Sequence, residues 1–148
     1  MTPEGAETSE EDEIRGLLET WANATRARDV DAIMAACAPE ILAFDCHGRL
    51  RFEGADAYRG HLEACLPCME GRMTFELHDL DGTAQGDVGF CHHPARCGGT
   101  GRDGREHGGW LRGTACFRRT GGTWEIVHEH FSAPFDPASG RALLDLRP

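Results

Sequence analysis

Residues 116–131, CFRRTGGTWEIVHEHF, decide how this chain folds. Two runs of strand-favouring residues flank Gly121 and Gly122. Glycine supplies the positive φ angles that a tight turn needs, so this pattern is a strong hairpin signal. The stretch therefore predicts an antiparallel strand pair near the end of the chain.

The second strand of this hairpin carries apolar and ionisable residues on both faces. Successive side chains of a strand point to opposite faces. The first face takes the even positions, namely Trp124, Ile126, His128 and His130, and the other takes Glu125, Val127, Glu129 and Phe131. A strand with one buried face would separate these residue types. Both faces are therefore predicted to be covered, and one of them to line a polar cavity.

Upstream of the hairpin, hydrophobic spacing predicts three helices and then further strands. The helices cover about residues 9–28, 30–37 and 55–66, and Pro39 and Pro67 end the second and the third. Strands are predicted over about 41–46, 73–80, 88–96, 108–119 and 123–132. Segregated helices and antiparallel strands indicate the α+β class, with a curved antiparallel sheet and three N-terminal helices enclosing a cavity. Residues 1–12 are expected to form a flexible acidic tail and residues 13–148 a single domain.

Composition limits the classes of partner. The net charge of −10 disfavours nucleic acid and anionic membranes as partners. No apolar run approaches the roughly 18 residues of a membrane span. Residues 1–13 lack the basic start and apolar stretch of a signal peptide, so a cytoplasmic location is expected.

Seven cysteines are an odd and high number for a chain of this length. In a reducing compartment most are expected to be free thiols. Cys65 and Cys68 form a CxxC motif, and Cys91 and Cys97 add further soft ligands. Because there is only one CxxC, a zinc site or a reactive thiol pair on these four residues is the weaker alternative. No metal and no cofactor is the expectation.

Several short motifs occur in a characteristic order: RDVDAIM at 28–34, APE at 38–40, GADAY at 54–58, GDV at 86–88 and GGTWEIVHEH at 121–130. Together, over about residues 14–146, the chain resembles the SnoaL-like, ketosteroid isomerase-like branch of the nuclear transport factor 2-like superfamily. The resemblance implies a cone-shaped α+β barrel that usually forms a homodimer through the outer sheet face. It also implies a range of activities covering isomerases, cyclases, dehydratases and members without known activity.

The resemblance places specific roles on three residues. Asp45 occupies the position of the general base of ketosteroid isomerases, at the end of the first strand. Trp21 stands where those enzymes have a tyrosine donor, and Ala115 lies at about the position of their protonated aspartate. The base is kept, one donor is altered and one is lost, which argues against steroid isomerisation. A structural role for Asp45 stays open, either as a turn cap or as a partner of Arg49 or Arg51.

The family pattern also assigns the cavity wall. His92 and Arg96 are implied to point inward, and Val127, Glu129 and Phe131 are implied to line the pocket. If the alignment with the family pattern shifts by one residue, the inward-facing and outward-facing residues of a strand are exchanged.

Three further residues are candidates for the cavity. Tyr58 lies on the buried face of the third predicted helix. Trp110 and Arg112 share one face of a strand, and Arg112 either clamps a carboxylate or pairs with Glu125 or Glu129 across the hairpin.

The leading hypothesis is a cofactor-independent acid/base enzyme of the isomerase, cyclase or dehydratase type that acts on a small organic molecule. Asp45 would be the base, and His92 or Trp21 would donate to the substrate oxygen. The alternative is a non-catalytic dimeric module for small-ligand binding or association.

Overall fold

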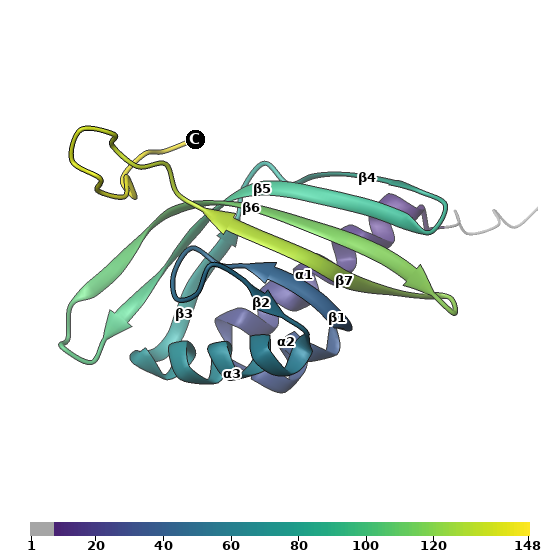
Figure 1. The fold of residues 1–148 in the computed structure, drawn as a ribbon, viewed down its shortest axis with the longest axis horizontal. Helices are drawn as coiled ribbons and strands as arrows, with labels where there is room; N and C mark the ends of the chain where they lie inside the picture. Colours follow the sequence, from purple (N-terminus) through teal and green to yellow (C-terminus); the bar gives the residue numbers. More distant parts are fainter. Residues whose placement is uncertain (1–7) are drawn as a thin grey trace, which may run out of the picture.

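Three helices pack against one face of a curved sheet, and the C-terminal segment lies beyond the end of the last strand (Figure 1). The computed structural model describes residues 8–148. Its helices are α1 (Glu10–Arg26), α2 (Val30–Ala35) and α3 (Ala55–Cys65), followed by the short 3-10 helix η1 (Leu66–Cys68). The Ser9 side chain caps α1 by accepting from the Asp12 N–H at 3.1 Å. The tail expected over residues 1–12 lies mostly outside the described residues, and its last three residues belong to α1.

The sheet contains seven strands in the order β2-β1-β7-β6-β5-β3, with β4 paired to β5. The strands are β1 (Cys37–Phe44), β2 (Phe52–Glu53), β3 (Met69–Leu77), β4 (Asp81–Gln85), β5 (Val88–Gly101), β6 (Glu106–Thr120) and β7 (Thr123–Ser132). The predicted α+β class and the hairpin of β6 and β7 are confirmed. The sheet is mixed rather than wholly antiparallel, because β1 lies parallel to β7.

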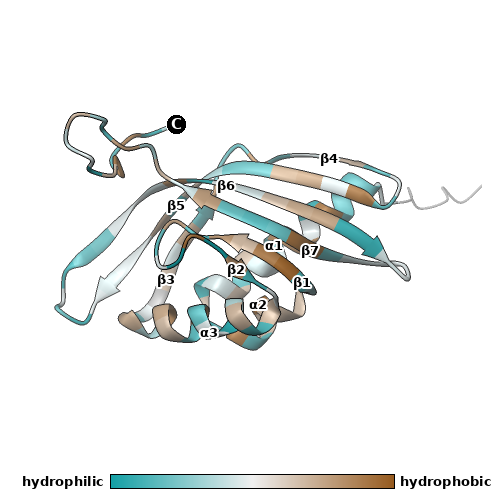
Figure 2. Cartoon of the chain, viewed as in Figure 1, coloured by the Kyte–Doolittle hydropathy of each residue, from teal (hydrophilic) through white to brown (hydrophobic). Residues whose placement is uncertain are grey.

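The core lies between the helices and the inner face of the sheet. Ile14, Leu18 and Trp21 recur at helical spacing on one face of α1, and all three are buried. Figure 2 shows the apolar stretch of β1, and along β7 an apolar stretch that is followed by a polar one. Each fully buried aliphatic or aromatic side chain of this kind stabilises the fold by roughly 1.5–3 kcal/mol. No helix in the described part of the chain is long and apolar enough to cross a membrane.

A β-bulge in β7 explains why apolar and ionisable residues alternate irregularly along this strand. Cys116 pairs with His128, whereas the next residue, Phe117, pairs with Ile126, so Val127 is the extra residue. Before the bulge, the Trp124 indole N–H reaches inward and donates to Glu13 of α1 at 2.6 Å. After the bulge, the inner face is taken by Glu129 and Phe131 instead of His128 and His130. Val127, which we expected in the pocket wall beside Glu129, is therefore the bulge residue.

The expected orientation of β5 is wrong by one residue. Cys91, His93 and Ala95 are buried on the inner face, and His92 and Arg96 are exposed. Both had been expected to point inward, and a shift of one position exchanges the two faces of a strand. His92 Nε2 instead lies 4.0 Å from the Asp81 carboxylate of the neighbouring strand β4.

A buried polar pair ties α3 to β7. The Tyr58 hydroxyl donates to Glu129 Oε2 at 2.7 Å, and Glu129 is only 2% exposed. The other oxygen, Oε1, has no hydrogen-bond partner among the described residues. Burial raises the pKa of Glu129 from 4.5 to about 7, against the opposing effect of the Tyr58 hydrogen bond, and the charge of Asp45 adds to the rise. Glu129 therefore holds a proton up to near-neutral pH.

This pKa shift predicts that Glu129→Gln changes how stability depends on pH. The pKa of Glu129 is higher in the folded than in the unfolded protein. The wild type is therefore most stable at low pH, where Glu129 is protonated in both the folded and the unfolded state. It loses stability as pH rises from about 4.5 through about 7. Glutamine can accept from Tyr58 but does not ionise. Relative to the variant, the wild type is expected to lose up to about 3 kcal/mol between pH 4.5 and pH 8, measured by urea unfolding.

The matched control is Glu125→Gln on the same strand, which should follow the wild-type pH profile. Parallel profiles for wild type and Glu129→Gln would contradict the assignment of the proton to Glu129.

Candidate functional site

An inner chamber of about 150 Å³ lies between the helices and the sheet. Trp21 of α1, Tyr58 and Cys65 of α3, Phe75 of β3 and Phe131 of β7 contribute to its wall. A cavity of about this volume with apolar walls accommodates a benzene-sized molecule.

A larger hollow of about 770 Å³, the vestibule, adjoins this chamber. It is lined by the ends of β1 and β7 and by the C-terminal segment. The two hollows share five lining residues, namely Asp45, Cys46, His47, Leu111 and Phe131. The junction of chamber and vestibule is therefore where ionisable side chains meet apolar ones.

Asp45, which lines both hollows, contacts His61, which lies behind it and lines neither. Asp45 comes directly after β1, in which Ile41 and Ala43 are buried, and the same alternation turns Asp45 inward. Asp45 Oδ2 lies 2.6 Å from His61 Nε2, and the two side chains are 16% and 6% exposed. Its other oxygen accepts from the Cys46 backbone N–H at 2.7 Å. The carboxylate is thus held by an imidazole.

The alternative partners considered for Asp45 were arginines. Arg51 pairs with Glu53 at 3.0 Å instead. Among the described residues, neither Arg49 nor Arg51 forms an ion pair with Asp45.

Packing fixes the imidazole of His61. Phe52 stacks on the ring with centroids 4.1 Å apart and planes 26° apart. Gly48 lies against the same ring, where an added Cβ would stand 3.2 Å from His61 Cε1, and its φ of +84° favours glycine. Sequence reasoning missed His61. Its position three residues after Tyr58 on the buried face of a helix was the signal that could have found it.

Trp21 offers a hydrogen-bond donor in the chamber wall. Its ring stacks on Phe131 at 5.8 Å and meets the edge of Phe75 at 5.2 Å. The buried indole Nε1 has no hydrogen-bond partner among the described residues. Since buried N–H groups are normally paired, this donor is suited to a ligand oxygen.

Cys65 faces two imidazoles. Its Sγ lies 3.5 Å from His61 Nδ1 and 4.0 Å from His47 Nδ1. Burial raises the pKa of the Cys65 thiol, and the charges of Asp45 and Cys68 add to the rise. These three residues form a group that could hold a metal ion in the described part of the chain.

The four cysteines considered from the sequence are not brought together as one set of ligands. Cys68 is exposed and donates to the Ala64 carbonyl at 3.7 Å. Cys91 is buried on the inner face of β5, and Cys97 contributes to the chamber wall. Of these four cysteines, only Cys65 belongs to a group of potential metal ligands in the described part of the chain.

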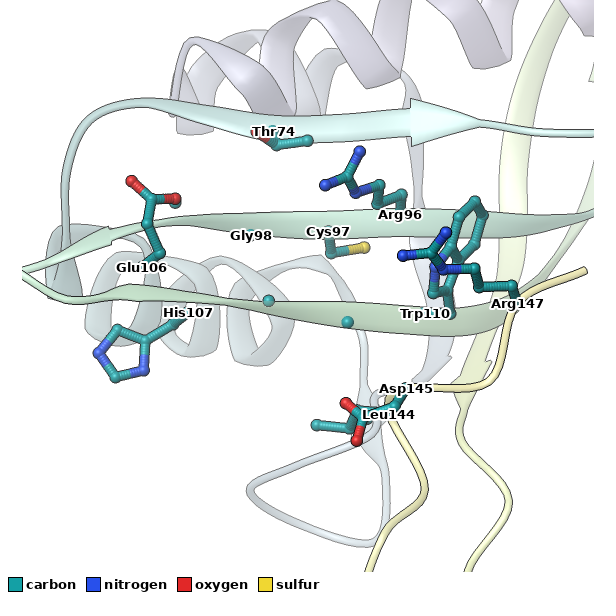
Figure 3. A pocket seen from close by; sticks show the side chains of 13 residues that line it. Thr74, Arg96, Cys97, Gly98, Glu106, His107, Trp110, Leu144, Asp145 and Arg147 are labelled. Carbon is teal, nitrogen blue, oxygen red and sulfur yellow. The ribbon is translucent and has the colours of Figure 1, made fainter.

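Other predicted site residues lie away from the chamber. Arg96 and Trp110 line a groove of about 610 Å³ between the strands and the C-terminal residues Asp145 and Arg147 (Figure 3). Arg112 donates to the Ser132 hydroxyl at 3.2 Å, not to a glutamate across the hairpin.

Neither Ala115 nor His92 offers a hydrogen-bond donor to the chamber. Ala115 is buried opposite Glu129 and offers no side-chain donor at that position. His92 contributes to neither the chamber nor the vestibule.

Comparison with known proteins identifies the family. The family model described as a SnoaL-like domain matches residues 14–136. No match to this chain is found among curated proteins. An NTF2-like protein of unknown function from Pseudomonas putida KT2440 shares 44% identity, with 93% of this chain and 96% of that chain covered and a TM-score of 0.86.

Two more distant structures share the fold alone. A ketosteroid isomerase-like protein from Erwinia carotovora atroseptica is 16% identical, with 84% and 95% of the two chains covered and a TM-score of 0.72. The association domain of C. elegans CaMKII is 18% identical, with 80% and 92% covered and a TM-score of 0.65. The match over residues 14–136, together with the 44% identical relative, shows that the chain belongs to the SnoaL-like family of the nuclear transport factor 2-like superfamily.

Proposed function

We propose that this protein is a small-molecule enzyme whose acid/base chemistry takes place at the junction of the chamber and the vestibule. The observation that carries the proposal is the 2.6 Å contact that His61 makes with Asp45, which lines both hollows. A carboxylate oriented by an imidazole beside an apolar chamber is suited to moving a proton to and from a bound molecule. Isomerisation, cyclisation and dehydration all begin with such a step.

Asp45 is the base in this proposal, and His61 positions it. The Cys46 N–H and His61 hold the two carboxylate oxygens, so the carboxylate points in one direction before a substrate arrives. Trp21 supplies the donor for the oxygen on which negative charge develops, and one such donor is worth about 10²- to 10³-fold in rate. His92 has no part in it, because it lies outside both hollows and beside Asp81 rather than Asp45.

The size and walls of the site suggest the substrate class. A chamber of about 150 Å³ takes one small ring or branched chain, and the vestibule of about 770 Å³ takes the remainder of the molecule. A small carbonyl compound fits these walls, with its oxygen toward Trp21 and an adjacent C–H toward Asp45. Steroid isomerisation is not proposed, since Ala115 offers no second donor.

A homodimer through the outer sheet face is part of the proposal. Phe90 and Val88 of β5 are exposed large apolar residues, and Phe90 is 46% exposed. A second copy would cover them. The alternative function is a non-catalytic dimeric binding or association module. It would use the same outer sheet face for dimerisation and the chamber for a small ligand.

Deuterium exchange tests the acid/base function. Wild-type protein is expected to exchange the protons next to the carbonyl of cyclohexanone or acetylacetone in D₂O, followed by proton NMR. Asp45→Asn should lower the exchange rate about 10²- to 10⁴-fold, because the amide cannot accept the proton. His92→Gln is the control and should exchange at the wild-type rate.

The same experiment separates the two functions. Exchange that persists in Asp45→Asn would refute the assigned base. Binding of these compounds with no exchange above the buffer rate would favour the non-catalytic module.

The dimer face has its own test. Phe90→Glu should convert the dimer to a monomer in light scattering, because a charge on each copy would be buried against the other. Leu50→Glu is the matched control, because Leu50 is 94% exposed in the loop between β1 and β2. A wild-type monomer, or dissociation by both variants alike, would contradict this interface.

A further inference from the structure

We infer that His47, His61 and Cys65 form a zinc site beside the junction of chamber and vestibule, with Asp45 holding His61 in position. The inference goes beyond the acid/base function and does not rest on it, because metal binding is measured without a reaction.

Two of the three distances between the ligand atoms are close to those around a zinc ion. Cys65 Sγ lies 3.5 Å from His61 Nδ1 and 4.0 Å from His47 Nδ1, and the three ligand atoms lie within 4.8 Å of one another. In a tetrahedral site with Zn–S of about 2.3 Å and Zn–N of about 2.0–2.1 Å, sulfur and nitrogen are separated by about 3.5–3.6 Å. The two distances to Cys65 are therefore within about 0.5 Å of that separation.

Local structure brings the three ligands to one place. Cys65 follows His61 by four residues on α3, so both side chains lie on one face of the helix. His47 comes from the loop after β1, where Gly48 allows close approach to the imidazole of His61. The two imidazole rings have centroids 5.1 Å apart.

Asp45 determines which nitrogen of His61 is available to a metal. A carboxylate accepts hydrogen bonds, so the 2.6 Å contact places the proton of a neutral imidazole on Nε2. The lone pair is then on Nδ1, the nitrogen that faces Cys65. A histidine that ligates zinc through one nitrogen and donates to a carboxylate through the other is the usual arrangement around such ions.

The ligand types select the ion. Two imidazoles and a thiolate suit zinc, whereas magnesium and calcium prefer oxygen ligands. His47 and Cys65 both contribute to the chamber wall, so three protein ligands leave a fourth position toward the cavity for water or a ligand oxygen. An ion there would supply Lewis acidity to that oxygen.

The same side chains have a competing interpretation, in which Cys65 is a nucleophilic thiol. In that case Asp45 would orient His61, and His61 would act as the base for the Cys65 thiol. A nucleophile of this kind needs only one imidazole beside its sulfur. Here a second imidazole, that of His47, also converges on Cys65, which favours a metal centre.

The experiment uses the full chain, kept reduced, freed of metal with a chelator and titrated with cobalt(II) and then zinc. We expect one cobalt per chain, with the visible bands of tetrahedral cobalt and a thiolate-to-cobalt charge-transfer band that zinc removes. Cys65→Ser should abolish the charge-transfer band. His47→Ala should weaken zinc binding at least tenfold, and Asp45→Asn should weaken it about 10- to 100-fold while keeping the band.

Two matched controls are available. Cys68→Ser alters the exposed cysteine of the same CxxC motif, and His92→Ala alters an exposed histidine outside the site. Both should bind cobalt and zinc as the wild type does.

Several results would overturn the inference. A charge-transfer band that survives in Cys65→Ser would do so, as would one lost equally in Cys68→Ser. Absence of cobalt binding together with selective alkylation of Cys65 by iodoacetamide would assign a nucleophilic thiol instead. The two proposals fail separately, because deuterium exchange by metal-free protein supports the acid/base function whether or not zinc binds.

Discussion

The extra residue at Val127 is the constraint on which the inside of this molecule depends. Upstream of the bulge, Trp124 donates to Glu13 of α1 and Ile126 is buried in the core, and downstream Glu129 accepts from Tyr58 of α3. Without the bulge, strict alternation would direct His128 rather than Glu129 to the inner face. One inserted residue therefore lets the same strand close the apolar core at one end and line a cavity at the other.

The bulge also explains which parts of the fold sequence reasoning could and could not predict. The hairpin at Gly121 and Gly122 and the α+β class follow from local patterns, and both are confirmed. A bulge changes the pairing register without changing composition, so the mixed faces of β7 were visible but their cause was not. The orientation predicted for His92 is wrong by one residue for a related reason. Side chains alternate between the two faces of a strand, and that alternation alone does not determine which face is buried.

The candidate site was predictable only in part, because its central contact joins distant residues. Asp45 could be proposed from its place at the end of the first strand. The helical spacing after Tyr58 could have marked His61 as buried, but not as the partner of Asp45, because that contact joins a loop to a helix 16 residues further along the chain. Gly48 and Phe52, which position the ring, have no pattern that marks them as neighbours of a histidine.

Glu129 is buried and Asp45 is half-buried, and their different environments separate their roles. Glu129 is fully enclosed with Tyr58, and burial raises its pKa to about 7, so it is suited to holding a proton within the fold. Asp45 lies on the junction of two hollows and contacts an imidazole whose other nitrogen faces Cys65. If zinc were bound at that nitrogen, His47, His61 and Cys65 would hold it, Asp45 would position His61, and the ion would supply Lewis acidity to a ligand oxygen. In the proposed acid/base function Asp45 is the base instead, so the two proposals give the same carboxylate different roles.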